Sequence, residues 1–263
     1  MSLRKTLLLA AAAVLAGVAL AAAGYGLVAV RAGGSGVTLA PGATITPSPR
    51  PTSTQSPSAT PKQWLVARAL RTLTVYERAE AGAPVRVLLP EHNRFGLDTV
   101  MLINTTVERG GRTWYEVWLP VPPNGSRGWI PAKNVTIYTV SSQIVIDTSR
   151  RVLQVVRDDK IVGEFKVAIG TRDLPTPTGF FYVTEKLKPD DPNTVFGVLA
   201  IGISAFQPKL PSWPGSGQVA IHGTNQAELI GRAVSQGCVR LRNQDILEVS
   251  RLVRTGSPVV IKR

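Results

Sequence analysis

"AIHGTNQAELIGRAVSQGCVRLRNQD" (residues 220–245) contains the only cysteine of the chain, Cys238, and one of its two histidines, His222. Sixteen residues separate these two side chains, and a glycine adjoins each of them. A nucleophilic thiol must lose its proton to a nearby base, and histidine is the usual base because its pKa lies near neutral pH. The stretch therefore indicates a cysteine–histidine site. The simpler alternative is that Cys238 is a small, buried and inert residue.

The residues around this pair predict how each member is held. His222 ends the apolar run "QVAI", so a strand is expected to fix it. The carbonyl of Gly223 is positioned to accept the other imidazole N–H and set the tautomer. A turn leads into Cys238, and the N–H groups of Gly237 and Cys238 are candidate donors to an oxyanion.

Arg240 lies two residues beyond Cys238, so both side chains point to the same side if the segment is extended. A guanidinium there lowers the thiol pKa or binds a substrate carboxylate. Each residue also has a plain structural explanation: His222 as a core histidine and Arg240 as a surface charge. The complete pattern, Ser-x-Gly-Cys-x-Arg after an upstream His-Gly, favours a catalytic site. With one histidine in each folded region and no second cysteine, we expect no metal and no cofactor.

Residues 141–263 read as a mainly β region. The run "QIVIDTSRRVLQVVRDDKIVGEFKVAIG" (143–170) predicts three strands, and further strands are expected in "TPTGFFYVTEKL" (176–187), "VFGVLAIGIS" (195–204), "GQVAIHG" (217–223) and "PVVIKR" (258–263). One helix is expected at 243–256, capped by Asn243 and ended by Gly256. A short second helix is expected near 226–233.

Residues 63–140 contain short β-type segments at 72–76, 99–103, 113–119 and 127–131, with turn signals between them. "TWYEVWLPVPPNGSRGWIP" (113–131) resembles bacterial SH3-like domains, which implies a small antiparallel β-barrel. Trp114, Trp118 and Trp129 are interpreted first as core or rim residues that bind nothing.

Residues 1–31 predict export. Arg4 and Lys5 precede an uncharged apolar run at 6–30 that is long enough to span a bilayer. We expect an uncleaved membrane anchor, with a cleaved signal peptide as the alternative. Residues 32–62 are rich in proline, serine and threonine and are expected to form an extended linker.

The net charge of +13 favours anionic partners such as acidic cell-wall polymers. Motifs typical of nucleic-acid recognition are absent from the sequence, so we expect no nucleic-acid partner. A membrane-anchored polyanion binder, which uses the charge and not Cys238, is one competing interpretation.

The Cys-centred stretch resembles the L,D-transpeptidase catalytic domain. The resemblance is carried by "IHGT" (221–224), "SQGCVRL" (235–241) and "PTPTGFF" (175–181). It implies that Cys238 is the nucleophile, His222 its base and Gly223 the residue that orients the imidazole. It also implies that Ser235, Gln236 and Gly237 form the pocket around the oxyanion. Thr224 and Arg240 are implied to bind the substrate. Gln236 stands where the family often has histidine, and glutamine cannot act as a base.

The resemblance implies a mixed β-sandwich with one or two helices and with the cysteine at one edge, preceded here by the SH3-like barrel. It also implies acyl transfer in the bacterial cell envelope: a peptidoglycan stem tetrapeptide acylates Cys238, D-alanine leaves, and an amine takes the acyl group to give a 3→3 cross-link. Papain-like wall peptidases and sortases order or space their cysteine, histidine and arginine differently. The main rival is a non-catalytic cell-wall-binding protein that retains the catalytic fold.

Overall fold

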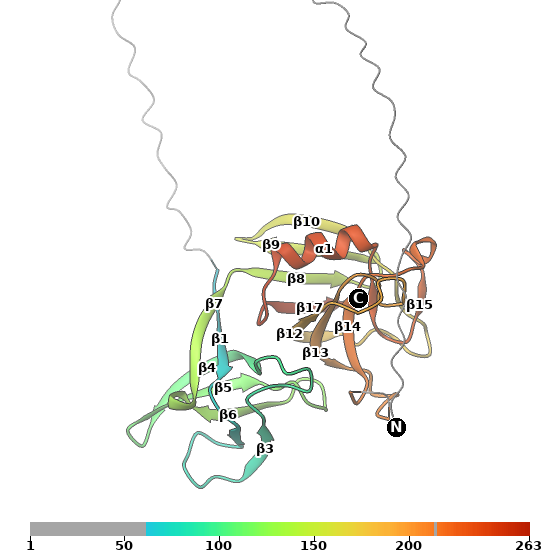
Figure 1. Ribbon diagram of the computed structural model, residues 1–263. Coiled ribbons are helices and arrows are strands. Elements are labelled where there is room, and N and C mark those ends of the chain that lie inside the picture. The colour runs from blue at the N-terminus through green and yellow to red at the C-terminus, as the bar shows by residue number, and fades with distance from the viewer. Residues whose placement is uncertain (1–61, 213–214) are drawn as a thin grey trace, which may run out of the picture. The chain divides into compact units, whose positions relative to one another are not determined.

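The computed structural model describes residues 62–212 and 215–263, which belong to one compact unit. Almost all of its regular structure is β, in two large sheets and one pair of short strands (Figure 1). The predicted anchor and nearly all of the predicted linker lie outside the described residues. Among the residues that are described, no helix combines the length and hydrophobicity needed to cross a membrane.

The first sheet, here called the N-terminal sheet, has seven antiparallel strands in the order β3-β2-β6-β5-β4-β1-β7. Its strands are β1 (Trp64–Ala69), β2 (Leu73–Tyr76), β3 (Val85–Leu89), β4 (Val100–Arg109), β5 (Arg112–Trp118), β6 (Arg127–Pro131) and β7 (Val135–Val140). The four strands predicted in this region are confirmed, and β1, β3 and β7 were not predicted. Trp114 is fully buried, as its interpretation as a core residue requires. The SH3-like resemblance remains a prediction.

The second sheet, here called the C-terminal sheet, is mixed and has the order β10-β9-β8-β17-β12-β13-β14-β16. Its strands are β8 (Ser142–Asp147), β9 (Val152–Arg157), β10 (Lys160–Lys166), β12 (Gly179–Leu187), β13 (Ala200–Phe206), β14 (Gln218–His222), β16 (Val239–Arg240) and β17 (Pro258–Lys262). The pairs β8–β17 and β14–β16 are parallel, and the others are antiparallel. This is the mainly β, mixed architecture that the sequence predicts.

Two short strands beside this sheet, β11 (Ile169–Gly170) and β15 (Ala233–Ser235), pair in parallel with each other. The helix α1 (Asn243–Leu252) buries Ile246 and Val249 in the core of the C-terminal sheet, and Arg157 of β9 donates to the Leu252 carbonyl. The predicted second helix is a single 3-10 turn at Ala227–Leu229.

Two expectations for the helix are wrong. It ends at Leu252, because Val253 takes an extended backbone, and does not continue to Gly256. Asn243 does not cap it, because its side-chain oxygen accepts the backbone N–H groups of Thr224 and Val198.

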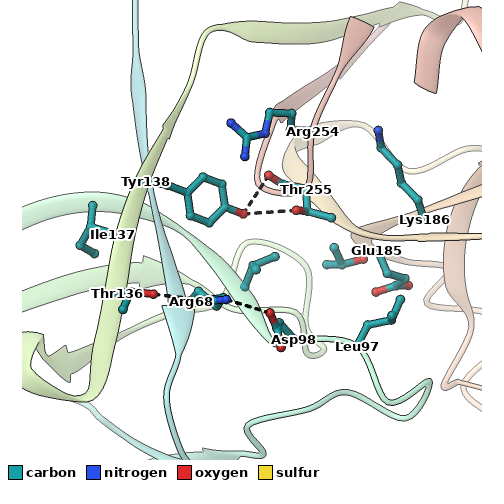
Figure 2. Close-up of a pocket in the computed structure, with 12 residues that line it drawn as sticks. Arg68, Leu97, Asp98, Thr136, Ile137, Tyr138, Glu185, Lys186, Arg254 and Thr255 are labelled. Atoms are coloured by element: carbon teal, nitrogen blue, oxygen red, sulfur yellow. Dashed lines mark hydrogen bonds and ion pairs between the residues drawn. The ribbon is translucent and has the colours of Figure 1, made fainter. Parts of the chain in front are cut away.

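The two sheets contact each other through apolar and polar groups. Tyr182 of β12 is fully buried in a cluster with Val66 and Val100, and its hydroxyl donates to the Val100 carbonyl at 3.1 Å. At β7, the Tyr138 hydroxyl donates to the Thr255 carbonyl at 3.0 Å (Figure 2). These two contacts hold the N-terminal sheet against β12 and the turn before β17 of the C-terminal sheet.

A cavity of about 710 Å³ adjoins this contact (Figure 2). Most of the charged groups that line it have partners: Arg68 pairs with Asp98 at 3.3 Å, and the Lys186 ammonium donates to two backbone carbonyls near the end of α1. Glu185 also lines the cavity. Glu185 therefore lies where the two sheets meet.

Candidate functional site

A cleft with a volume of about 830 Å³ lies over β12, β13 and β14. Small residues face it from two adjacent strands: Ala200 and Gly202 of β13 and Ala220 of β14. Gly202 pairs directly with Ala220. Because these residues have little or no side chain, the sheet backbone forms the floor of the cleft, together with the Glu185 side chain that lies over Gly202. Cys238 lines the same cleft.

Cys238 immediately precedes β16, the strand at the edge of the C-terminal sheet. Its Sγ accepts the backbone N–H of Ala220 at 3.4 Å. The residue is partly exposed, yet the sulfur is deep enough for burial to raise the pKa of the thiol, while the Ala220 N–H and the Arg240 charge act in the opposite direction. The resting cysteine is therefore a thiol at neutral pH, and it needs a base in order to react.

Ser235 and Gly237 shape the turn that presents Cys238. The buried Ser235 hydroxyl donates to the Cys238 carbonyl at 2.5 Å and accepts the Gly237 N–H at 3.1 Å. Gly237 has a φ of +119°, a conformation that side chains with a Cβ rarely adopt, and a Cβ there would meet the Gln207 amide at 3.0 Å. Both residues thus set the loop conformation, and the Gly237 N–H is already bound within that loop.

The "PTPTGFF" stretch supports this turn from behind. Gln207 donates its side-chain amide to the Pro175 carbonyl at 2.8 Å and lies against Gly237. The Thr176 hydroxyl accepts the Gly170 N–H at 2.9 Å, which ties the stretch to β11. The link from Pro175 through Gln207 to Gly237 places the second recurring sequence element beside the Cys238 turn. Sequence inspection had not identified Gln207.

His222 is the last residue of β14, and its side chain is 2% exposed. Nδ1 lies 2.6 Å from the Gly223 carbonyl. Since a carbonyl oxygen only accepts, Nδ1 carries the proton in the tautomer that satisfies the Gly223 contact, and the Val195 backbone is a second hydrogen-bond partner of the ring. Burial lowers the pKa of His222 to about 4. The Arg240 charge assists this shift, and the hydrogen bonds with the Gly223 and Val195 backbones oppose it. The imidazole is consequently neutral at pH 7, as a general base must be.

The strand register places the His222 and Cys238 side chains on one face of the sheet. β14 and β16 run parallel, with His222 opposite Arg240, so Cys238 lies two residues before the position opposite His222. Residues two positions apart on a strand share a face, which makes His222 and Cys238 diagonal neighbours. Among the described residues no hydrogen bond joins them, and the Phe196 ring packs over the imidazole with 5.0 Å between centroids.

Three other candidate residues take different places. Gln236 is exposed and lines the cleft next to Cys238. Arg240 donates to the Gln226 side chain at 3.1 Å and is not part of the cleft lining. Thr224 is buried, with its hydroxyl accepting the Gln226 N–H, so it has no access to the cleft in this structure. No cluster of three metal-ligating side chains occurs in the part of the chain that the structure describes.

Asn243 joins the two segments that surround His222. Its side-chain oxygen accepts the Thr224 N–H at 3.1 Å, just after the His222–Gly223 pair, and the Val198 N–H at 3.3 Å, two residues after Phe196. One amide oxygen therefore fixes both the end of β14 and the loop that covers the imidazole. The sequence contains no local signal for this role, because the three partners are far apart along the chain.

We predict that replacing Asn243 by alanine lowers the stability by about 2–4 kcal/mol, because two largely buried N–H groups lose their acceptor. Turnover should fall with it, since the loop over His222 is no longer held. Thermal unfolding and initial rates would be measured together. Asn243→Asp is the matched control, because a carboxylate keeps the acceptor and suits the first turn of a helix. Equal losses in both variants would contradict this explanation.

The depressed pKa of His222 predicts that acid destabilises the fold. Below about pH 6.5 the unfolded chain protonates this histidine, whereas the folded protein does so only near pH 4, so the unfolded state binds more protons in that window. Stability is full above pH 6.5 and falls toward pH 4. With about 1.4 kcal/mol per pKa unit, the loss from this group approaches roughly 3 kcal/mol.

Urea unfolding at pH 7, 6, 5 and 4 would measure this loss. The wild-type protein should lose more stability across the range than His222→Asn, and the difference between the two slopes reports His222 alone. Parallel slopes for wild type and His222→Asn would refute the assignment.

Comparison with known proteins gives a consistent result. A family model, the L,D-transpeptidase catalytic domain, matches residues 141–261. The putative L,D-transpeptidase YkuD of Bacillus subtilis is 29% identical over 126 residues, which are 48% of this chain and 69% of that protein. The putative L,D-transpeptidase YqjB of the same organism is 30% identical over 129 residues, covering 45% of this chain and 69% of that protein.

Among solved structures, an L,D-transpeptidase of Enterococcus faecium superposes with a TM-score of 0.37 at 22% identity. The superposition covers 47% of this chain and 50% of that one, so this chain spans about half of that protein. The sequence relatives, together with the matching family model, decide the assignment: the chain belongs to the L,D-transpeptidase family and carries the family's catalytic domain at residues 141–261.

Proposed function

We propose that this enzyme is a peptidoglycan L,D-transpeptidase that forms 3→3 cross-links by cysteine acyl transfer. The observation that carries the proposal is the position of Cys238 in an 830 Å³ cleft, with the neutral His222 on the same face of the adjacent strand. The cleft is large enough for several residues of a peptide. Its floor of small residues leaves room beside the thiol for a substrate backbone.

In the first half-reaction, His222 takes the thiol proton and the Cys238 sulfur attacks the carbonyl carbon of the third residue of a stem tetrapeptide. A tetrahedral intermediate forms. Its collapse breaks the bond to D-alanine, and the protonated imidazole donates its proton to the departing amine. The products are a thioester on Cys238, free D-alanine and a neutral histidine.

In the second half-reaction, the side-chain amine of a diamino acid on another stem attacks the thioester. His222 accepts a proton from this amine, and the sulfur leaves as the new amide forms. The proton returns to the thiol. The net change exchanges one amide for another, so the reaction needs no external energy source, metal or redox partner.

Two features of the site bear on how these steps begin. His222 lies under Phe196 and is not bonded to Cys238 in this structure, so proton transfer requires the Val195–Phe196 segment to move when substrate enters. Of the two oxyanion donors expected from the sequence, the Gly237 N–H is bound by Ser235, which favours the Cys238 N–H as the principal donor. Apo geometry of catalytic groups commonly tightens in the substrate complex.

The proposed setting is the bacterial cell envelope, outside the cytoplasmic membrane. The positive charge of the chain suits an anionic cell wall, and residues 1–31 are proposed as an anchor or signal peptide. The linker at 32–62 would hold the folded part away from the membrane. An SH3-like function of the N-terminal sheet, such as binding wall peptide or glycan, belongs to the same proposal.

The test is mass spectrometry of the full-length protein incubated with purified disaccharide-tetrapeptide. Release of D-alanine together with a cross-linked dimer and a transient acyl adduct on Cys238 would support the proposal. Release of D-alanine without dimer would keep the thioester and move the acceptor to water or another amine. Binding of the muropeptide with neither adduct nor product would favour the non-catalytic wall-binding alternative.

A further inference from the structure

Two residues that line the active-site cleft, Arg94 and Phe95, come from a loop of the N-terminal sheet. They lie in the connection between β3 and β4, more than 120 residues before Cys238 in the chain. All the other lining residues belong to the C-terminal region at 141–263. The cleft is therefore built from both sheets, and the N-terminal sheet contributes one positive charge and one aromatic ring to it.

Asn93 fixes the segment that carries these two residues. Its side-chain oxygen accepts the N–H groups of Phe95 and Leu97 at 2.9 and 3.1 Å, which closes a tight turn. Its side-chain amide donates to Glu185 of β12 at 3.3 Å. The turn is thus organised internally and attached to the floor strands of the cleft by the same side chain.

Arg94 makes a second attachment. Its guanidinium donates to the Gln218 side chain at 2.9 Å, and the Gln218 amide in turn donates to Glu185 at 2.9 Å. Glu185 is only 4% exposed, and its side chain crosses Gly202, where a Cβ would come within 1.9 Å of a carboxylate oxygen. A buried carboxylate thus orients the Gln218 amide, and Gln218 orients the arginine.

The guanidinium packs against the backbone of Gly215, and among the described residues most of its N–H donors have no hydrogen-bond partner. Of five N–H donors, one hydrogen bond to Gln218 is formed, and within the described residues Arg94 has no ion pair. The guanidinium lies 4.6 Å from the Phe95 ring centroid, and this ring is 43% exposed. A stacked, exposed guanidinium with unused donors is suited to bind a carboxylate by two parallel hydrogen bonds.

Its distance from the thiol can be counted along β14. Gln218, which holds the guanidinium, is two residues before Ala220, which donates to the Cys238 sulfur. Two residues of strand span roughly 7 Å, as do two residues of an extended peptide bound alongside. Gln218 reaches toward Glu185 of β12, whereas Cys238 lies on the β16 side of β14, so a group bound at Arg94 is at least about two extended residues away from the carbonyl attacked by Cys238. The departing D-alanine carboxylate is too close to that carbonyl to be the group concerned.

We propose that Arg94, supported by Phe95, is a substrate-specificity residue that binds a carboxylate of the donor stem peptide two or more residues from the attacked carbonyl. This inference rests on the proposed function, because it names the part of that substrate which the N-terminal sheet recognises. It assigns Asn93, Gln218 and Glu185 as positioning residues, which hold the Arg94 segment through the hydrogen bonds described above.

The experiment compares donor tetrapeptides in which each carboxylate is amidated in turn, using full-length wild type, Arg94→Gln, Arg94→Lys and the exposed-arginine control Arg112→Gln. For the free donor, Arg94→Gln should lower kcat/KM by about 10-fold or more, mainly through KM, since it removes charge-assisted hydrogen bonds. Amidation of one particular carboxylate of the donor should lower kcat/KM of the wild-type enzyme by a similar factor. The same amidation should leave kcat/KM of Arg94→Gln unchanged. Arg94→Lys should restore part of the preference, and Arg112→Gln should behave as wild type.

Binding of the same peptides to Cys238→Ala, with and without Arg94→Gln, gives a readout that needs no turnover. If wild type processes no donor but the Arg94-dependent binding preference persists, the proposed reaction fails and the subsite stands. If Arg94→Gln affects all donors equally, or affects none, the subsite is refuted whether or not transfer occurs.

Discussion

Cys238→Ala should lose the formation of cross-linked dimer by a factor of about 10,000 or more, because no other side chain can form the covalent intermediate. Cys238 is the only cysteine in the chain, so no second thiol can substitute for it. Release of D-alanine from the tetrapeptide should disappear together with dimer formation, since both depend on the same thioester. Mass spectrometry of the products over several hours would measure both.

The single cysteine also makes this result easy to control. Alkylation should add one adduct to the wild-type protein and none to Cys238→Ala, and the circular dichroism and melting temperature of the two proteins should agree closely. Substantial D-alanine release by a folded Cys238→Ala protein would show that the proposed nucleophile is wrong.

His222→Asn should reduce the rate of acyl transfer by about 100- to 10,000-fold, the range expected for loss of a general base. Asparagine preserves a donor close to the Nδ1 position, so the contact with the Gly223 carbonyl can be retained while the lone pair of Nε2 is lost. The fall should appear in kcat more than in KM, because His222 is buried and does not line the cleft. Steady-state kinetics with the tetrapeptide donor would separate the two parameters.

His92→Asn is the matched control for that experiment. His92 is the other histidine and lies in the exposed connection between β3 and β4, with Nε2 3.6 Å from Asp98. Its replacement should change the rate by less than about two-fold, as expected at a surface position. The rate of Cys238 alkylation near neutral pH should also slow in His222→Asn. An unchanged alkylation rate with unchanged kcat would mean that the thiol is activated without this histidine.

Local sequence patterns were sufficient for much of the C-terminal sheet. The alternation of apolar and polar residues in "QIVIDTSRRVLQVVRDDKIVGEFK" gives the strands β8, β9 and β10, and the structure confirms them. Extended segments without clear turn signals were harder. β1 begins directly after the proline-rich linker, and three of the five residues of β3 are exposed, so neither segment shows the periodicity of a strand with one buried face.

The start of β13 shows how a tertiary contact overrides the local pattern. The apolar run begins at Val195, but the strand begins only at Ala200. Before that, Gly197 takes a left-handed φ of +62° and the Val198 N–H is bound by Asn243 rather than by a neighbouring strand. The same contact explains why Asn243 does not cap its helix: its oxygen is used elsewhere, by residues that no local pattern connects to it.

For the site, the sequence alone was enough to propose the chemical groups, but it did not indicate their surroundings. Spacing and glycine neighbours brought out Cys238 and His222, and the register of β14 with β16 places them on a common face. The burial that lowers the His222 pKa, the Phe196 ring above it and the arrival of Arg94 all depend on residues distant in sequence. Those features become visible only when the sheets are assembled.

The position of β17 has a consequence for how the protein is made. This strand lies between β8 and β12 and is the only link in the C-terminal sheet between the β10-β9-β8 half and the β12-to-β16 half. Its parallel pairing with β8 joins residues about 115 positions apart, such as Ile144 and Val259. While the ribosome is still translating residues 148–257, the two halves cannot unite, and such non-local pairing forms slowly. The nascent catalytic region therefore stays open throughout its synthesis, with unpaired strand edges that chaperones or an export machinery can hold until the final strand closes the sheet.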